Sequence, residues 1–135
     1  MLDRAPDRGR RAPEQRALDL GTEGWKLPPL DLLRSFTPRE WRSFREMVAS
    51  PYFNRNTELG LLADWLDQFA PKFESVKRAA AHAQLFPGEA ADEARLNHLM
   101  SFLLKLAEEF IALELYRKDK YAPANFALRA LGERG

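Results

Sequence analysis

Residues 92–121 read DEARLNHLMSFLLKLAEEFIALELYRKDKY, and this stretch decides the fold. Its main apolar residues are separated by steps of three and four, which place them on one side of a helix: Leu96, Leu99, Leu103, Leu106, Phe110 and Leu113. A second apolar line widens that side and consists of Met100, Leu104, Ile111 and Leu115. A stripe this wide must be buried against other helices, so the sequence predicts an all-α fold.

Shorter helical patterns flank this stretch, and we expect about five helices in all. The clearest start signal is Thr37-Pro38-Arg39-Glu40, a capping box in which Thr37 caps the helix and Glu40 bonds back to it. The same preference for small polar residues assigns further N-caps to Asn56 or Thr57, to Ser75 and to Asp92. We expect further helices over residues 30–35, 57–69 and 76–84, and a last short helical pattern over residues 124–131.

The long helix is expected to form the spine, with the helices that begin at Thr37 and Thr57 packed on it. Because the helices differ in length, helix-pair or solenoid-like packing is favoured over a closed four-helix bundle. An irregular helical bundle with a long C-terminal helix is the other arrangement considered. Residues 1–27 are rich in charge and poor in apolar side chains, which predicts a disordered tail. Residues 28–135 then form a single helical domain.

Composition narrows the class of protein. The chain has 135 residues, of which 45% are hydrophobic, which is typical of one globular domain. It carries 21 basic and 20 acidic residues, so its net charge is +1. Residues 1–29 hold six bases and five acids, which leaves 15 of each for the remainder. The folded part is therefore neutral, whereas a dedicated nucleic-acid-binding domain usually has a clear basic excess.

The cysteine content and the lengths of the apolar runs indicate the cellular compartment and whether the chain crosses a membrane. The chain has no cysteine, which rules out disulfides, zinc–thiolate sites and thiol catalysis within it. It has no apolar run of 18 residues, and its N-terminal stretch has no apolar core typical of a secretory signal. We therefore expect a cytoplasmic protein without a membrane partner.

The sequence offers no constellation typical of catalysis. Its two histidines, His82 and His98, are sixteen residues apart and fall on different predicted helices. Glycine-rich phosphate loops and nucleophile signatures such as G-x-S-x-G are absent from the sequence. We therefore expect no catalytic residue, no metal site and no cofactor, and we expect that the chain is not an enzyme.

Two hypotheses about function follow. The favoured one is a non-enzymatic helical protein-interaction or assembly module, because the stripe on the long helix exceeds what so small a body covers. The residues left for a protein partner or for self-association are Leu104, Ile111 and Leu115. The alternative is nucleic-acid binding through a basic cluster that is opposed locally only by Glu40 and Glu46. That cluster consists of Arg34, Arg39, Arg42, Arg45 and Arg55.

Four motifs occur in order along residues 30–120: Leu33-x-x-Phe36-x-x-x-Glu40-x-x-x-Phe44, SPYFN at 50–54, LFPG at 85–88, and LNxLMSxLL at 96–104. As an ordered set they resemble the N-terminal region of a family of uncharacterised bacterial all-helical proteins. The resemblance implies an all-helical fold and no particular activity, catalytic residue or cofactor. It also implies that such proteins continue as further helices, so that residues 28–135 are expected to be the N-terminal part of a longer helical protein.

Overall fold

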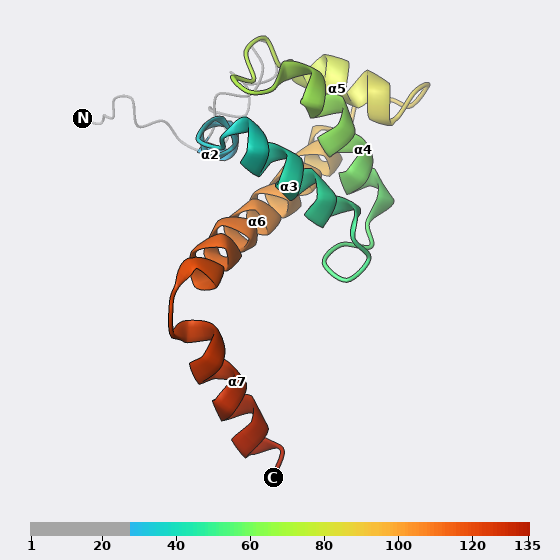
Figure 1. The fold of residues 1–135 in the computed structure, drawn as a ribbon. Helices are drawn as coiled ribbons and strands as arrows, with labels where there is room; N and C mark the ends of the chain where they lie inside the picture. Colours follow the sequence, from blue (N-terminus) through green and yellow to red (C-terminus); the bar gives the residue numbers. More distant parts are fainter. Residues whose placement is uncertain (1–27) are drawn as a thin grey trace, which may run out of the picture.

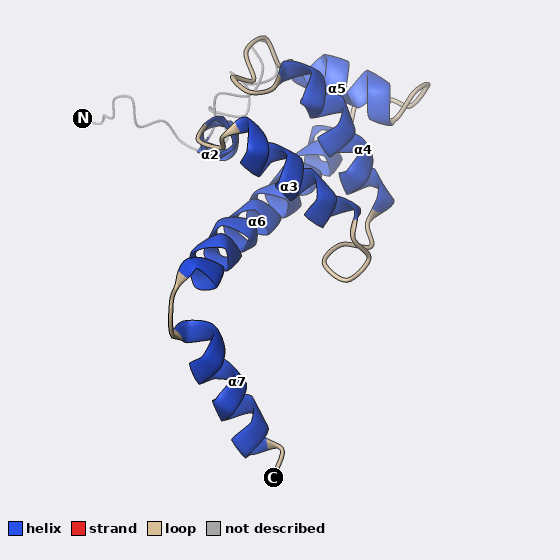
Figure 2. Ribbon diagram, in the orientation of Figure 1, coloured by secondary structure: helices blue, strands red, loops and turns tan. Residues whose placement is uncertain are grey.

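The computed structural model describes residues 28–135, which form helices and loops without a strand (Figures 1 and 2). The predicted all-α fold is confirmed, and the described residues contain six α-helices where about five were expected. The helices are α2 (Pro28–Arg34), α3 (Pro38–Ala49), α4 (Thr57–Leu66), α5 (Arg78–Leu85), α6 (Glu93–Lys118) and α7 (Ala122–Glu133), with a 3-10 turn, η1 (Asp67–Phe69), after α4. The predicted disordered tail, residues 1–27, lies outside the described residues.

Three of the four predicted helix starts are confirmed. In the capping box, the N–H of Glu40 donates to Thr37 Oγ1 at 3.1 Å and the N–H of Thr37 donates to Glu40 Oε1 at 2.8 Å. The Asn56 side chain accepts from the first N–H groups of α4, and Asp92 accepts from the N–H of Arg95 at 3.1 Å. These bonds satisfy backbone donors that have no partner within the helix.

The prediction that Ser75 caps a helix was wrong. α5 begins at Arg78, and its N-cap residue Lys77 makes no side-chain capping bond. Ser75 has φ of 64°, in the left-handed region, whereas an N-cap residue needs extended backbone. The backbone of Phe73 is also in the left-handed region. The side chains of Phe73 and Val76 are both buried. The turn is shaped by the burial of these two side chains, which local sequence does not reveal.

α6 is the spine of the fold, with α2, α3, α4 and α5 packed against it (Figure 1). Five residues of its predicted stripe are buried and the sixth, Leu113, is half-buried against the core. Phe44 of α3 lies at the centre, fully buried, with the ring centroids of Phe36, Trp41 and Phe110 between 5.6 and 5.9 Å away. The predicted packing of the Thr37 and Thr57 helices on the long helix is therefore confirmed.

α7 is different, because it projects away from this body (Figure 1). It is longer than the expected segment 124–131, since Pro123 lies in its first turn, where proline is tolerated, and does not interrupt it. It contacts the end of α6, where the rings of Tyr116 and Phe126 are 6.0 Å apart. None of its twelve residues is buried. Within residues 28–135, no helix combines the length and the apolar character needed to cross a membrane.

Candidate functional site

The apolar residues of α7 cover a wide arc of the helix. At about 100° per residue this arc spans about 200°, from Phe126 through Ala130, Ala127 and Leu131 to Leu128, so Phe126 and Leu128 lie on nearly opposite sides. The polar side chains recur every four residues on the other side, at Asn125, Arg129 and Glu133. Phe126, Leu128 and Leu131 are each more than half exposed. The helix is thus amphipathic, and within the described residues its apolar arc stays largely exposed, apart from the contact of Phe126 with Tyr116.

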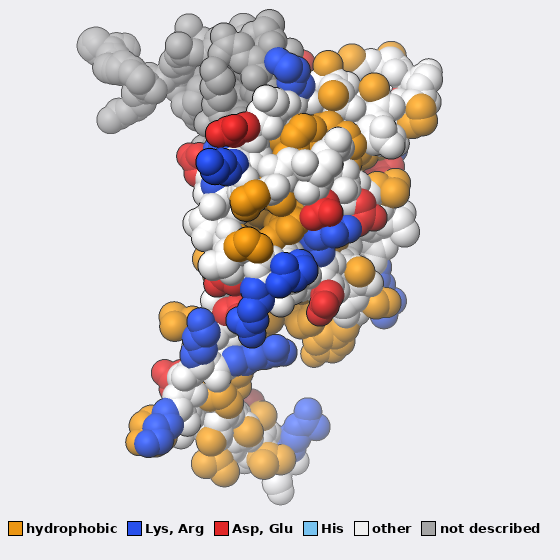
Figure 3. Space-filling model, turned by 45° about the horizontal axis from the view of Figure 1, so that its top comes forward, with side chains coloured by type: hydrophobic (Ala, Val, Ile, Leu, Met, Phe, Trp, Pro, Cys, Tyr) orange, Lys and Arg blue, Asp and Glu red, His pale blue; other side chains and the backbone are white. Residues whose placement is uncertain are grey.

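The end of α6 continues this surface. Of the three residues expected from the sequence to meet a partner, Leu115 is 72% exposed and Ile111 is 40% exposed, whereas Leu104 is half-buried. Ile111 and Leu115 are one helical turn apart and therefore lie on the same side of α6. We call Ile111 and Leu115 together with the apolar side of α7 the arm surface. In Figure 3, α7 is the lower part of the molecule, where hydrophobic side chains gather.

Most of the arm surface was missed from the sequence. Segment 124–131 was expected to be a last short helix, and its leucines were not assigned to an interface. The signal was present in Ala124, Leu128 and Leu131, which are spaced by four and three residues. What the sequence did not reveal is that α7 leaves the body and stays uncovered.

The orientation of α7 is set by Asp119 in the turn after α6. Its Oδ1 accepts hydrogen bonds from the N–H groups of Tyr121 and Ala122, both at 2.8 Å. These two bonds favour the ionised carboxylate and lower the pKa of Asp119 below its ordinary value. The charge also lies at the N-terminus of α7, where the helix dipole stabilises an anion. The turn is therefore held by specific hydrogen bonds.

A groove of about 360 Å³ lies beside the end of α6, between α6, α3 and the turn after α3. Its apolar residues are the more buried ones, with Met47 and Phe110 buried and Phe53 and Leu113 half-buried. Its other residues are polar or charged and line its edges: Arg39, Ser43, Glu46, Ser50, Glu114 and Arg117. An apolar floor between charged edges is typical of a site that receives a helix.

The SPYFN motif forms the turn at one end of this groove. Asn54 holds the turn, because its Nδ2 donates to the carbonyl of Val48 at 2.8 Å and its Oδ1 accepts from the N–H of Asn56 at 3.0 Å. Phe53 packs against the core, whereas Tyr52 is 88% exposed and contacts the Phe53 ring. Tyrosine is enriched at the hot spots of protein interfaces, so the exposed Tyr52 beside the groove is a candidate contact residue.

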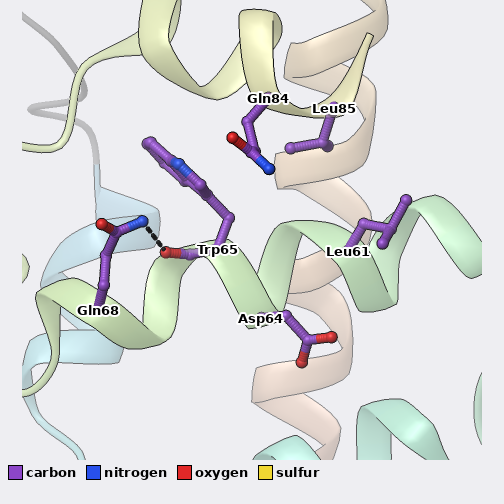
Figure 4. A pocket seen from close by; sticks show the side chains of 6 residues that line it. All are labelled: Leu61, Asp64, Trp65, Gln68, Gln84 and Leu85. Atoms are coloured by element: carbon purple, nitrogen blue, oxygen red, sulfur yellow. Dashed lines mark hydrogen bonds between the residues drawn. The ribbon is translucent and has the colours of Figure 1, made fainter. Parts of the chain in front are cut away.

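A second hollow, of about 320 Å³, lies between α4 and α5 and is lined by Leu61, Asp64, Trp65, Gln68, Gln84 and Leu85 (Figure 4). Its polar groups do not converge on a common point. Gln68 donates to the carbonyl of Trp65 at 2.9 Å, and Asp64 is paired with Arg45 at 2.8 Å. Binding sites for small molecules need polar groups directed at the ligand, so this hollow is the weaker candidate.

Of the five arginines of the predicted basic cluster, three are bonded within the body and two are exposed on α3. Arg45 is neutralised by two acids that are distant in sequence, Asp64 at 2.8 Å and Asp67 at 3.2 Å. Arg34 donates to the carbonyls of the 72–73 turn and pairs with Asp31, and Arg55 donates to the carbonyl of Pro51. Arg39 and Arg42 lie exposed on α3. On the face of the molecule in Figure 3, several basic side chains lie next to one another in a diagonal band, with acidic side chains on both sides of it.

The LFPG motif and the titratable groups near it serve the fold. Leu85 and Phe86 are buried, and the guanidinium of Arg95 lies 3.8 Å from the centroid of the Phe86 ring. The hydrogen bond from Arg95 to Glu58 raises the pKa of Arg95 above its ordinary value. His82 Nε2 accepts from the N–H of Asp92 at 3.0 Å. Among residues 28–135, no three histidine or acidic side chains are grouped so that they could hold a metal ion.

No family model matches the chain, and no curated protein or solved structure matches it either. The resemblance of the SPYFN and LFPG motifs to a family of bacterial helical proteins therefore stays a prediction. The surfaces described above are what remains to indicate a function.

Proposed function

We propose that this chain is a non-enzymatic helical protein-interaction or assembly module and that the arm surface is its contact site. The observation that supports the proposal is that α7, twelve residues long, is amphipathic and has no buried residue. Isolated helices of this length are only marginally stable in water, and most helical stability in proteins comes from packing of the apolar side. The body of this chain supplies little of that packing, so a protein partner is expected to supply it.

The size of the arm surface supports the same conclusion. The large apolar side chains of the arm surface and of the turn before α7 are each at least 40% exposed: Ile111, Leu115, Tyr121, Phe126, Leu128 and Leu131. Scattered apolar residues are common on protein surfaces, but contiguous apolar patches of several hundred Å² are typical of interaction sites. These six residues lie along the end of α6, the turn that follows it and α7.

The test is light scattering across a concentration series of the full chain, together with binding of a hydrophobic dye. The variant Leu128→Ser with Leu131→Ser removes the two most exposed apolar side chains of α7, and Leu61→Ser is the control, because Leu61 is 53% exposed on α4. We expect a mass above that of one chain, or dye binding, that the arm variant abolishes and the control retains. A strict monomer that binds no dye would contradict the proposal.

Nucleic-acid binding is the second proposal, supported by the exposed Arg39 and Arg42 and by Arg117, which lines the groove opposite Arg39. Binding through phosphate contacts weakens steeply with salt, with a slope of about −0.9 per phosphate neutralised on duplex DNA. We expect the variant Arg39→Glu with Arg42→Glu to reduce both the affinity for a mixed-sequence duplex and this slope. Binding that the variant leaves unchanged would exclude this site.

A further inference from the structure

We propose that the nucleic acid of the second proposal is single-stranded, and that it binds along α3 and the end of α6 with one base stacked on Tyr52. This inference rests on that second proposal, because it names the class of nucleic acid that the same arginines contact. Two features of this face support it. They are exposed arginines without an ion pair in the described part of the chain, and a tyrosine ring that lies in solvent.

The arginines of this face are available to a ligand. Arg45, by contrast, is held by two acids of the body. Within residues 28–135, the side chains of Arg39, Arg42 and Arg117 are exposed and make no ion pair or hydrogen bond. Arg39 and Arg117 line the same groove, and Arg42 follows Arg39 by about one turn of α3. Free guanidinium groups that lie this close together can bind successive phosphates.

Tyr52 supplies a ring on which a base can stack. Its side chain is 88% exposed, and its ring is perpendicular to that of Phe53 with the centroids 5.0 Å apart. The backbone of the turn is fixed, since the N–H of Tyr52 donates to Ser50 Oγ at 3.3 Å and Asn54 bonds to both sides of the turn. Figure 1 shows the connection between α3 and α4 as a loop that projects from the body. A tyrosine on a fixed turn loses little conformational freedom when it binds.

These two features favour a single strand over a duplex. The bases of a duplex are paired and stacked on one another, so they offer no free face to a ring outside the helix. The bases of a single strand are accessible, and proteins bind such strands with basic side chains on the phosphates and aromatic rings on the bases. Arg55 adds a phosphate contact beside Tyr52, because only its Nε is used, on the carbonyl of Pro51.

The acids on the same face give the stacked base a large share of the affinity. Glu46 and Glu114 line the groove together with Arg39 and Arg117, so the edges of the groove have no net charge. Phosphate contacts alone are therefore expected to bind weakly. A base stacked on an aromatic ring contributes affinity that does not depend on the net charge of the face.

The length of α3 sets the length of the site. From Arg39 to Ser50, at the end of α3, the helix rises by about 16 Å at 1.5 Å per residue. A stacked strand advances by about 3.4 Å per nucleotide. The face from Arg39 to Tyr52 therefore accommodates about five nucleotides.

The test is fluorescence anisotropy of the full chain with labelled oligonucleotides of one mixed sequence, about ten nucleotides long, which is twice the expected site. The probes are single-stranded DNA, single-stranded RNA and duplex DNA. We expect both single strands to bind more tightly than the duplex. In Tyr52→Ala the affinity for the single strands should fall by about fivefold to 150-fold, the range for loss of one stacked base.

Two variants serve as controls. Tyr52→Phe keeps the aromatic ring, and Tyr121→Ala removes another exposed tyrosine, which is 64% exposed in the turn before α7. Both should bind the single strands as the unaltered chain does. Because Tyr52 is almost fully exposed, its replacement is not expected to unfold the body, and circular dichroism of each variant checks this.

The results that would overturn the inference are distinct from those that would overturn the second proposal. Equal affinity for single strands and duplex, or binding that Tyr52→Ala leaves unchanged, would overturn the inference alone, provided that Arg39→Glu with Arg42→Glu still weakens binding. Displacement of the single strand by polyglutamate at an equal concentration of charge would mean that the face binds an acidic protein instead. If no oligonucleotide binds, the inference and the second proposal both fail, whereas the proposal for the arm surface is tested separately by light scattering.

Discussion

α6 and α7 follow each other in the chain, both are amphipathic, and they differ in what covers their apolar sides. Seven residues of α6 are buried, and they include Leu96, Leu103 and Phe110 in contact with the helices that precede it. α7 has no buried residue, although Leu128 and Leu131 are spaced as regularly. The comparison shows that an apolar stripe specifies burial but does not specify which molecule provides the cover. In the body the chain provides it, and for α7 we propose that a protein partner does.

The largest expected loss of stability is at a buried residue of the body, where the chain covers its own apolar side chains. Phe44→Ala removes a fully buried ring that contacts three other aromatic rings, and large-to-small replacements of this kind cost about 3–5 kcal/mol of unfolding free energy. Leu131→Ala, on the uncovered side, is expected to cost less than about 0.5 kcal/mol in dilute protein, as is usual at exposed positions. Urea unfolding of both variants at low concentration measures the difference. Equal losses would mean that α7 is covered within a single chain.

An intermediate effect is expected at the start of α3, which is a covered helix. Thr37→Ala removes the acceptor of the capping box and should cost about 1 kcal/mol, within the range of 0.5–2 kcal/mol for such caps. Thr37→Ser keeps the acceptor and serves as the control in the same urea titration. If Thr37→Ala is as stable as the serine variant, the side-chain bond seen at this cap contributes nothing to the stability of the body.

The smallest expected effect concerns the turn that separates the two regions. Because its hydrogen bonds lower the pKa of Asp119 in the folded state, the turn gains stability from the carboxylate above the ordinary pKa of about 3.9. This gain is lost as the pH falls through the lower, folded pKa. We expect the amide resonances of Tyr121 and Ala122 to shift with that low pKa in an NMR titration. In Asp119→Asn the shift should disappear, and a midpoint at or above the ordinary value would contradict the hydrogen bonding described.

The sequence predicted the parts of the fold that depend on neighbouring residues. The stripe of α6 and the caps at Thr37, Asn56 and Asp92 are set by spacings of three or four residues, so they could be read directly. The wrong cap at Ser75 arose because burial of Phe73 and Val76, against residues distant in sequence, fixes the backbone there.

The candidate site was predictable only in part, for the same reason. Ile111 and Leu115 were expected at an interface and are exposed, whereas Leu104 is half-buried by packing that spacing does not reveal. The pairing of Arg45 with Asp64 and Asp67 joins α3 to the end of α4, and it divides a basic cluster that looked continuous in the sequence. The groove arises where α3 and its turn lie against α6, and no local pattern gives the position of one helix on another.

The central claim is that the body is covered within one chain and that α7 is covered only by association. Hydrogen–deuterium exchange of the full chain, followed by mass spectrometry over a range of protein concentrations, tests it most directly. We predict that protection of residues 96–110 of α6 stays constant, whereas protection of α7 (Ala122–Glu133) is low in dilute protein and rises with concentration. Protection of α7 equal to that of α6 in dilute protein would contradict the claim, whereas low protection of α7 at every concentration would mean that a different protein covers it.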